Sequence, residues 1–522
     1  MNKGKIEFKG WLCSALIGIC MALFSCQQIP TTYYSSWGIW TTVVGAFVLG
    51  CYLCYSNRVM LRDFVKNHPY QSFLSLLAAL AINYMAWQGK GSICLSGITN
   101  PMAKIFLRRE CYFISSIALA FIILLLLRPA QKIVREMFQS IESNERKLYF
   151  TFSVIYLVGI AFLYYHNAMW YKQYDIAAFG VDSGWCYYSV FPNLEYTDIR
   201  HPLMAEIMFP VYALANFVVK IIVPHQLQEC ILAVLMQFVL MQMVLLVGVM
   251  IRIISKRPEV FLLYSVSYPV MQYSLTLEKY QICVFFVVLY LYLLQREEQG
   301  SELSYAFAAG CMPTSGIILI AELFQKRSYF KSWIFRFARI AATGVSVLIL
   351  LGRSYMLNVV DTYQEIHDMH AWYGGEPPTV KEKFFAVLHM IQGSFVALSS
   401  EMDHWEGLYE KTGVLCALIV MVVVIGAILS FKESFTKMTI IWAVFPFILF
   451  IPLNWSPNET PLFSLMFSWA YIYLFSKAID LFSERFHWNR RAIYYTMVVI
   501  LALVNMVEMM DINQFLITYS TL

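Results

Sequence analysis

The sequence predicts an all-α polytopic membrane protein, and three observations support this fold class. The 522 residues are 59% hydrophobic and only 14% charged, and their mean hydropathy is +0.60. Soluble domains carry roughly 25% charged residues, so this chain has too little polar surface for water. Apolar runs of roughly 17–25 residues recur along its whole length, which is the length that a helix needs to cross a bilayer. A membrane β-barrel would instead show short segments of alternating hydropathy.

The apolar runs predict about thirteen transmembrane helices. In chain order they lie near residues 10–26, 37–55, 71–88, 112–128, 148–166, 229–253, 259–276, 280–296, 332–352, 413–430, 438–453, 462–482 and 491–510. The first run follows Lys3, Lys5 and Lys9, a pattern that also begins signal peptides. Because many apolar runs come after it, we interpret residues 10–26 as a transmembrane helix.

Two further apolar segments carry charged or helix-breaking residues. Residues 203–223 include Glu206 and Pro210, and we expect this segment to form an interfacial helix along the membrane surface. Residues 303–323 are interrupted at Pro313, which predicts a broken hairpin that enters the membrane from the inner side.

The basic residues predict sidedness, because Lys and Arg stay preferentially on the cytoplasmic side. With the N-terminus inside, and with 203–223 on the surface, most basic segments fall inside: 128–147, 252–257, 326–331, 432–437 and 485–491. Residues 89–111, which include Lys90, fall outside against this rule. The polar segments that share the outer face are then 167–202, the turn at 278–279, 353–412 and 454–461.

The polar content predicts a division of the chain along its sequence. Residues 1–130 form an N-terminal four-helix membrane block with few polar residues beyond the topology signals. Residues 131–147 form a charged cytoplasmic linker. The membrane core spans 148–510 and includes the outer loops 167–202 and 353–412, and residues 511–522 form a C-terminal tail.

The outer loop 167–202 holds the most informative polar residues. Asp182 is followed by Trp185, Tyr187 and Tyr188, aromatic residues that suit a membrane interface and also stack on sugar rings. Partial burial among such residues raises the pKa of a carboxyl group toward the range of a general base. In most proteins an aspartate in such a loop is simply solvated, and this alternative stays open.

The same loop ends in the cluster Asp198-Ile-Arg200-His201-Pro202. Arginine binds phosphate bidentately, and histidine shares protons or binds metal, so the cluster is a candidate substrate site. The alternative is a structural turn that leads through Pro202 into the next helix. The two interpretations are compatible.

Three other outer positions are candidate substrate-binding sites. Glu278 and Lys279 lie between two predicted spans, where they either face a lipid headgroup or anchor the helix ends. Arg353 follows a span directly and is a candidate for phosphate binding. Asn458 and Glu459 lie in a polar turn that either binds sugar hydroxyls or has only a structural role.

A metal site and a nucleic-acid site are not predicted. His367 and His370 lie about one helical turn apart, but the spacing fixes no third ligand. The long outer loop that holds them, 353–412, is expected to cover a substrate instead. The net charge of +5 is spread over short loops and indicates no nucleic-acid partner.

The run from Asp182 through Tyr187 and Tyr188 to Asp198-Ile-Arg-His201-Pro-Leu203 resembles the first outer loop of GT-C membrane glycosyltransferases. The similar branch includes lipid-A aminoarabinose transferases, lipopolysaccharide-core galacturonosyltransferases and protein mannosyltransferases. In those enzymes an acidic residue follows the first core span and a His-Pro-Pro-Leu-like motif closes the loop. The resemblance covers about 148–510. The chain departs from it with one proline after His201 and with Asp182-Ser183 in place of paired acids.

The resemblance implies a multi-pass enzyme of the bacterial cytoplasmic (inner) membrane. It implies transfer of a sugar from a polyprenyl-phosphate donor to a glycan or lipid acceptor on the outer face, with Asp182 as the general base and inversion at the anomeric carbon. Surface cations, among them Arg200, Lys279 and Arg353, would stabilise the leaving phosphate. A lone acid is a poor divalent site, so a divalent metal stays an open alternative that no paired-acid motif supports, and no other cofactor is predicted. Membrane lipids are the remaining partners.

Two other functional classes stay open. A polysaccharide polymerase or ligase acts at the same membrane face but uses Arg and His residues of a large outer loop, here Arg353 or His404. A non-enzymatic transporter, flippase or scaffold expects polar residues along mid-membrane faces, and the sequence shows no intramembrane series of acids of that kind.

Overall fold

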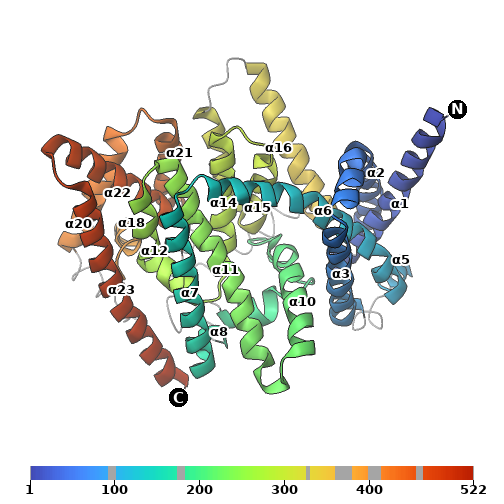
Figure 1. The fold of residues 1–522 in the computed structure, drawn as a ribbon, viewed down its shortest axis with the longest axis horizontal. Coiled ribbons are helices and arrows are strands. Elements are labelled where there is room, and N and C mark those ends of the chain that lie inside the picture. Colours follow the sequence, from blue (N-terminus) through green and yellow to red (C-terminus); the bar gives the residue numbers. More distant parts are fainter. Residues whose placement is uncertain are drawn as a thin grey trace. The chain divides into compact units, whose positions relative to one another are not determined.

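The computed structural model describes residues 2–33, 35–91, 101–172, 183–324, 330–358, 379–397, 413–453 and 463–520. All regular elements in these ranges are helices, and no strand occurs among them. Figure 1 shows the helices coloured along the chain. The predicted all-α fold class is therefore confirmed.

The α-helices are α1 Asn2–Gln28, α2 Ser36–Asn67, α3 Pro69–Ala86, α5 Pro101–Phe106, α6 Arg109–Gln139, α7 Ser143–His166, α8 Met169–Lys172, α9 Ser183–Trp185, α10 Met204–Ile222, α11 His225–Ser255, α12 Pro258–Ser265, α13 Tyr268–Leu275, α14 Tyr280–Gln295, α15 Ser301–Cys311, α16 Phe330–Leu350, α18 Val380–Gly393, α20 Gly413–Leu429, α21 Ser434–Phe450, α22 Ser464–Phe486 and α23 Arg490–Ser520. Three 3-10 helices are η1 Thr31–Tyr33, η4 Pro313–Phe324 and η5 Ser354–Leu357, and two π-helical turns are η2 Trp87–Gly91 and η3 Cys186–Val190.

The helices form two compact units, each assembled from segments that are distant in the sequence. Unit 1 comprises Met1–Glu136, Tyr188–Gln228 and Trp333–Ile366. Unit 2 comprises Met137–Tyr187, Glu229–Ser332 and His367–Leu522. This division differs from the one expected along the sequence, because unit 1 joins the N-terminal block to two segments of the predicted membrane core.

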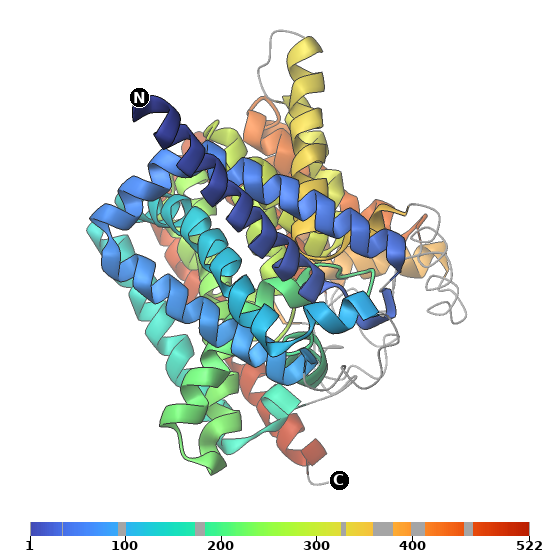
Figure 2. The ribbon, with the colours of Figure 1, turned by 90° about the vertical axis from the view of Figure 1, so that its right-hand side faces the viewer.

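In unit 1, α1 and α2 pack side by side through small residues (Figure 2). A Cβ atom on Gly18 would lie 2.6 Å from the Cys51 sulfur, and one on Gly50 would lie 3.0 Å from the Gly18 Cα. Membrane helices approach closely where such small residues face each other. Buried amides add polar contacts, since the Asn83 side chain of α3 donates to the Tyr112 carbonyl of α6 at 3.0 Å.

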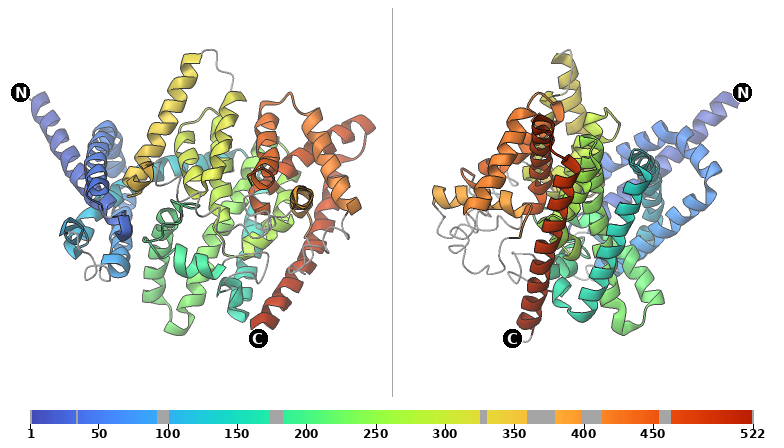
Figure 3. Two further views of the ribbon diagram at one scale, coloured as in Figure 1. Left: turned by 180° about the vertical axis from the view of Figure 1, so that it is seen from behind. Right: turned by 60° about the vertical axis from the view of Figure 1, so that its left-hand side comes forward.

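In unit 2, α22 is the most buried of the long apolar helices, and 83% of its most apolar window is inside the protein. It packs against α20, among the orange and red helices of Figure 3. The contact is close at Gly426, where an added Cβ would lie 1.9 Å from the Leu474 carbonyl oxygen. A larger residue at position 426 would force α20 and α22 apart.

The chain breaks its helix between α12 and α13, at Val266 and Ser267. A break inside a membrane protein leaves backbone groups that need new partners. The Asn505 side chain of α23 donates to the Val266 carbonyl at 2.9 Å. The Tyr156 hydroxyl of α7 donates to the Ser265 carbonyl at 2.6 Å. Side chains from two neighbouring helices therefore stabilise the break.

Ion pairs fix the relative direction of α7 and α11 in unit 2. Lys172, which follows α7, pairs with Glu229 in the first turns of α11. Glu145, in the first turn of α7, pairs with Arg252 near the end of α11. The two helices are therefore antiparallel, as the predicted topology requires for them.

In the described ranges, nine helices are long and apolar enough to cross a membrane. All but one coincide with a predicted span, and several other predicted spans correspond to shorter helices such as α14, α20 and α21. A multi-pass membrane protein is therefore supported, whereas the number of thirteen crossings stays a prediction. The exception is α10, which was expected on the membrane surface but has the length and composition of a crossing helix.

The broken hairpin predicted at 303–323 corresponds to two different helical elements. The α-helix α15 ends at Cys311, and a 3-10 helix, η4, starts at Pro313. Two predicted boundaries differ from the structure. The linker 131–147 is partly the end of α6, and most of the tail 511–522 continues α23 to Ser520. The extension of α6 contains residues that favour helices, among them Lys132, Arg135 and Glu136.

Candidate functional site

The predicted site residues separate into three groups. Three of them lie outside the described residues, and these are Asp182, Asn458 and Glu459. The same holds for His367, His370 and His404. Unit 2 holds Tyr187, Glu278 and Lys279, and unit 1 holds Tyr188, Asp198, Arg200, His201 and Arg353.

The turn between α13 and α14 holds a buried ion pair in unit 2. Glu278 is completely buried, and Lys279 is 4% exposed. The Glu278 carboxylate accepts the Lys279 backbone N–H at 2.7 Å and lies 3.5 Å from the Lys279 ammonium. The Gln281 side chain accepts the Glu278 N–H at 3.1 Å. Buried charges persist when they are paired and hydrogen-bonded, so this turn is a preorganised polar site.

The segment that directly follows Asp182 packs on this ion pair. The Cys186 thiol donates to the Glu278 carboxylate at 3.5 Å. The Lys279 ammonium lies 4.5 Å from the centre of the Trp185 ring, a cation–π distance. Ser183 is completely buried as well. Residues 183–187 thus connect the predicted catalytic position to a carboxylate and an ammonium.

Tyr187, the last residue of this segment, contacts α11. Its hydroxyl donates to the Glu229 carbonyl at 3.0 Å, and its ring packs edge-on against Tyr171 at 5.7 Å. Tyr187 is buried, whereas Tyr188 is 40% exposed. Tyr187 therefore has a packing role, and only Tyr188 presents a large part of its ring at the surface.

In unit 1, residues 191–203 form a connection before α10 that we term the motif loop. The Arg200 side chain donates to the Asp198 carboxylate from Nη2 at 2.7 Å and from Nε at 3.0 and 3.1 Å. The Tyr196 hydroxyl donates to the same carboxylate at 2.9 Å. Burial by itself raises the pKa of Asp198, but the hydrogen bonds from Arg200 and the positive charges of His201 and Arg200 outweigh it and hold the pKa at about 2. Asp198 is therefore ionised at neutral pH.

His201 is buried at the end of the motif loop. Its backbone N–H donates to the Asp198 carbonyl at 3.0 Å, and its own carbonyl accepts the Met204 N–H at 3.1 Å. The turn therefore leads directly into α10, so the predicted structural role of the cluster is present.

Arg353 is completely buried and joins two other parts of unit 1. Its guanidinium forms an ion pair with Glu206 of α10 and donates to the Tyr196 carbonyl at 2.9 Å. It also donates to the Tyr355 hydroxyl at 3.3 Å. Arg353 was expected to bind a phosphate, but these contacts engage it inside the protein and favour a role in holding the motif loop.

A second buried cation, Lys90, contacts the start of the motif loop. Its ammonium lies 2.7 Å from the Glu195 carboxylate and donates to the Ile29 carbonyl. Thr31 donates to Glu195 through both its backbone N–H and its hydroxyl, each at 2.6 Å. Burial by itself raises the pKa of Glu195. The Lys90 charge and the hydrogen bonds from Lys90 and Thr31 outweigh this effect, so the pKa lies below its usual range.

Four connections of unit 1 therefore meet at one end of its helices, namely 29–33, 87–91, 191–203 and 351–357. The stacked rings of Tyr33 and Tyr355, 3.8 Å apart, add a further contact among them. The predicted topology puts all four on one side of the membrane, and the contacts agree with it. The pairing of Lys90 with Glu195 also offers a reason for a lysine on the predicted outer side, since the pair carries no net charge.

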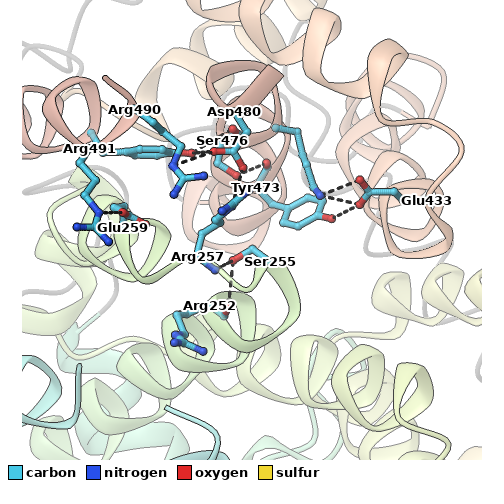
Figure 4. A network of polar contacts seen from close by, with 12 residues as sticks. Arg252, Ser255, Arg257, Glu259, Glu433, Tyr473, Ser476, Asp480, Arg490 and Arg491 are labelled. Carbon is cyan, nitrogen blue, oxygen red and sulfur yellow. Dashed lines mark hydrogen bonds and ion pairs between the residues drawn. The ribbon is translucent and has the colours of Figure 1, made fainter. Parts of the chain in front are cut away.

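An arginine-rich network ties helix ends of unit 2 together (Figure 4). Asp480 of α22 lies 3.2 Å from Arg257 and 3.8 Å from Arg490. Arg491 lies 3.8 Å from Glu259, and Lys477 lies 2.6 Å from Glu433. Arg257 begins α12, whereas Glu278 follows α13, so this network and the Glu278–Lys279 pair lie at opposite ends of that broken helix. The predicted inner location of these basic residues agrees with this separation.

Sequence reasoning missed Lys90, Glu195 and Glu206 as site residues. Their partners lie more than 60 residues away in the chain, and a single sequence carries no such pairing. A signal existed for two of them. Lys90 violated the distribution of basic residues, and Glu206 is an acid in an apolar helix, which is costly unless it is paired.

The described ranges contain no group of three or more His, Cys, Asp or Glu side chains that is arranged to hold a metal ion. Compared with known protein families, with curated proteins and with solved structures, the chain gives no match in any of the three comparisons.

Proposed function

We propose that the protein is an integral membrane glycosyltransferase. It moves a sugar from a polyprenyl-phosphate donor to a cell-envelope glycan or lipid acceptor on the outer face of the bacterial inner membrane. One observation supports this above the others. Residues 183–187, which follow Asp182 directly, pack on the buried Glu278–Lys279 pair. A carboxylate base and a nearby fixed cation are the two charges that such a transfer requires.

In the proposed reaction the acceptor hydroxyl gives its proton to Asp182 while its oxygen bonds to the anomeric carbon. The bond between that carbon and the donor phosphate oxygen breaks, and polyprenyl phosphate leaves with the bonding electrons. Lys279 stabilises the charge that grows on the phosphate, and Glu278 keeps the ammonium oriented. A single displacement inverts the anomeric carbon, and it needs one base and no covalent intermediate.

The remaining predicted residues would bind the substrates. Tyr188 offers an exposed ring for stacking on a sugar. Arg200 is 25% exposed in its side chain and is held by Asp198, so it can contact a phosphate without moving far. Asn458 and Glu459 stay candidates for sugar hydroxyls. For Arg353, the contacts with Glu206 and Tyr196 support a role in positioning the motif loop within unit 1.

The proposal is tested in a strain that lacks the protein, by analysing its surface glycans and its lipid-linked sugars. We expect one sugar to be missing from a surface glycan and its polyprenyl-phosphate donor to accumulate. Expression of the wild-type chain restores the sugar, and Asp182→Asn does not, although the variant reaches the membrane at normal levels. Glu110→Gln, which changes an exposed acid of α6, is the matched control and restores the sugar. An unchanged glycan profile in the deletion strain would refute the proposal.

A further inference from the structure

The sequence alone assigns no residue of the N-terminal block, residues 1–130, to the proposed reaction. In the structure, however, side chains and backbone groups of this block contact Glu195 near the start of the motif loop. Lys90 and Thr31 bind the Glu195 carboxylate, and Lys90 also donates to the Ile29 carbonyl; all three residues come from the block. Glu195 in turn lies three residues before Asp198.

Lys90 is the central member of this group. Its side chain is 3% exposed, so water does not compete for its ammonium. The ammonium contacts partners from two different segments, the Glu195 carboxylate and the Ile29 carbonyl. An exposed ion pair contributes little to stability, whereas breaking a desolvated pair leaves a buried charge without compensation. Loss of Lys90 would therefore release Glu195.

Tyr196 carries this effect from Glu195 to the rest of the motif loop. Its carbonyl accepts from Arg353 at 2.9 Å, and its hydroxyl donates to Asp198 at 2.9 Å. A displacement of Glu195 would move Tyr196, the next residue, and so alter both contacts. The Asp198–Arg200 pair then loses one of its hydrogen-bond donors.

We propose that Lys90 is a positioning residue, through which the N-terminal block holds the Asp198–His201 part of the motif loop in its working geometry. Lys90 acts through Glu195 and touches no substrate in this account. The consequence for catalysis rests on the proposed function, whereas the consequence for the loop does not.

The experiment is hydrogen–deuterium exchange of the full-length protein in lipid nanodiscs, read on peptides that cover residues 191–203. We expect Lys90→Met to speed exchange there by about tenfold or more, as the loss of a charged hydrogen bond predicts. Exchange in α22 stays unchanged. Lys104→Met, which removes an exposed lysine from the neighbouring helix α5, is the matched control and leaves the motif loop unchanged.

Two further variants separate positioning from general structural damage. Lys90→Arg keeps the charge, so hydrogen exchange in the motif loop stays slow. The charge-swapped double variant Lys90→Glu/Glu195→Lys restores slow hydrogen exchange in part. If Lys90→Met does not insert into the membrane, Glu195→Gln provides the same comparison, because it removes the charge without changing the shape of the side chain. Wild-type exchange rates in the motif loop of Lys90→Met or Glu195→Gln would overturn the proposal.

The transfer reaction gives a separate readout. We expect Lys90→Met to lower kcat/KM by about tenfold, since the variant misplaces Arg200, which contacts the donor phosphate in the proposed function. If the wild-type protein transfers no sugar, the proposed function fails, and the exchange experiment still decides whether Lys90 positions the loop.

Discussion

At the scale of single residues, Asp198 shows how one ionised side chain orders the motif loop. It accepts hydrogen bonds from the Arg200 side chain, from the Arg200 backbone and from Tyr196. All of these favour the ionised form, so the pKa of Asp198 is about 2 instead of the ordinary 3.8. The folded protein therefore stabilises the ionised form of the Asp198 carboxyl group relative to the unfolded chain.

This lowered pKa predicts a defined dependence of stability on pH. Because the folded pKa lies below the unfolded one, the stabilisation is complete above the unfolded value and is lost as the pH falls through about 4 to 2. Its size is about 2 kcal/mol. We expect the difference in melting temperature between the wild-type protein and Asp198→Asn, measured in detergent, to shrink from about pH 5 to about pH 3. A difference that stays constant over this range would contradict the assignment.

Gly352 allows the chain to place Arg353 where it is. Its φ angle is +69°, and an added Cβ would lie 2.7 Å from the backbone of Ser25, Gln28 and Ile29. Gly352→Ala is therefore expected to destabilise the protein by about 2–4 kcal/mol, from backbone strain and from steric overlap. Gly344→Ala is the control, since no atom lies within 4 Å of the added methyl group there. Equal melting temperatures for the two variants would refute this explanation.

At the scale of elements, the sequence predicted most helices because apolar runs are local signals. The break between α12 and α13 was not predicted, since residues 259–276 read as one uninterrupted span. Its cause is partly outside the segment, in Asn505 of α23 and Tyr156 of α7. The sequence also does not decide the position of α10 relative to the membrane. The ion-pair partner of Glu206, Arg353, lies 147 positions away in the chain.

The helix break gives a test at this scale. The Asn505 side chain donates to the Val266 and Phe395 carbonyls and accepts the Ala397 N–H at 3.0 Å. Asn505→Ala removes the side-chain partner of the Val266 carbonyl and of the Ala397 N–H, whereas the Phe395 carbonyl still accepts the Tyr268 N–H, and we expect a cost of about 2–3 kcal/mol. We expect a lower melting temperature for this variant than for Met506→Ala, which truncates a neighbouring exposed side chain of the same helix. A melting temperature of Asn505→Ala equal to that of the wild-type protein would show that the break needs no such partner.

At the scale of the whole molecule, contacts between distant segments decide the organisation. The sequence indicated a division near residue 130, whereas unit 1 combines the N-terminal block with residues 188–228 and 333–366. The ion pairs that join these segments, Lys90–Glu195 and Arg353–Glu206, connect residues 105 and 147 positions apart. Composition and hydropathy carry no information about such pairs.

The sequence predicts which charged residues belong to the candidate site, but it does not predict which of them contact each other. Glu278 and Lys279 were identified as a charged turn, and the structure adds that the segment after Asp182 packs on them. The sequence predicts Arg353 as a candidate phosphate ligand, and its buried contacts with Glu206 and Tyr196 favour a role in holding the motif loop. The role of Asp182 stays a prediction that follows from its place in the sequence and from the resemblance of its loop.

The most direct test of the proposed function is a transfer assay with the purified protein in nanodiscs. The substrates are a polyprenyl-phosphate sugar identified from the deletion strain and the matching acceptor, and the measured quantity is the release of polyprenyl phosphate. We expect release by the wild-type protein and a rate lower by about 100-fold or more for Asp182→Asn, the usual contribution of a general base. Release by Asp182→Asn at the wild-type rate would contradict the central claim that this carboxylate activates the acceptor.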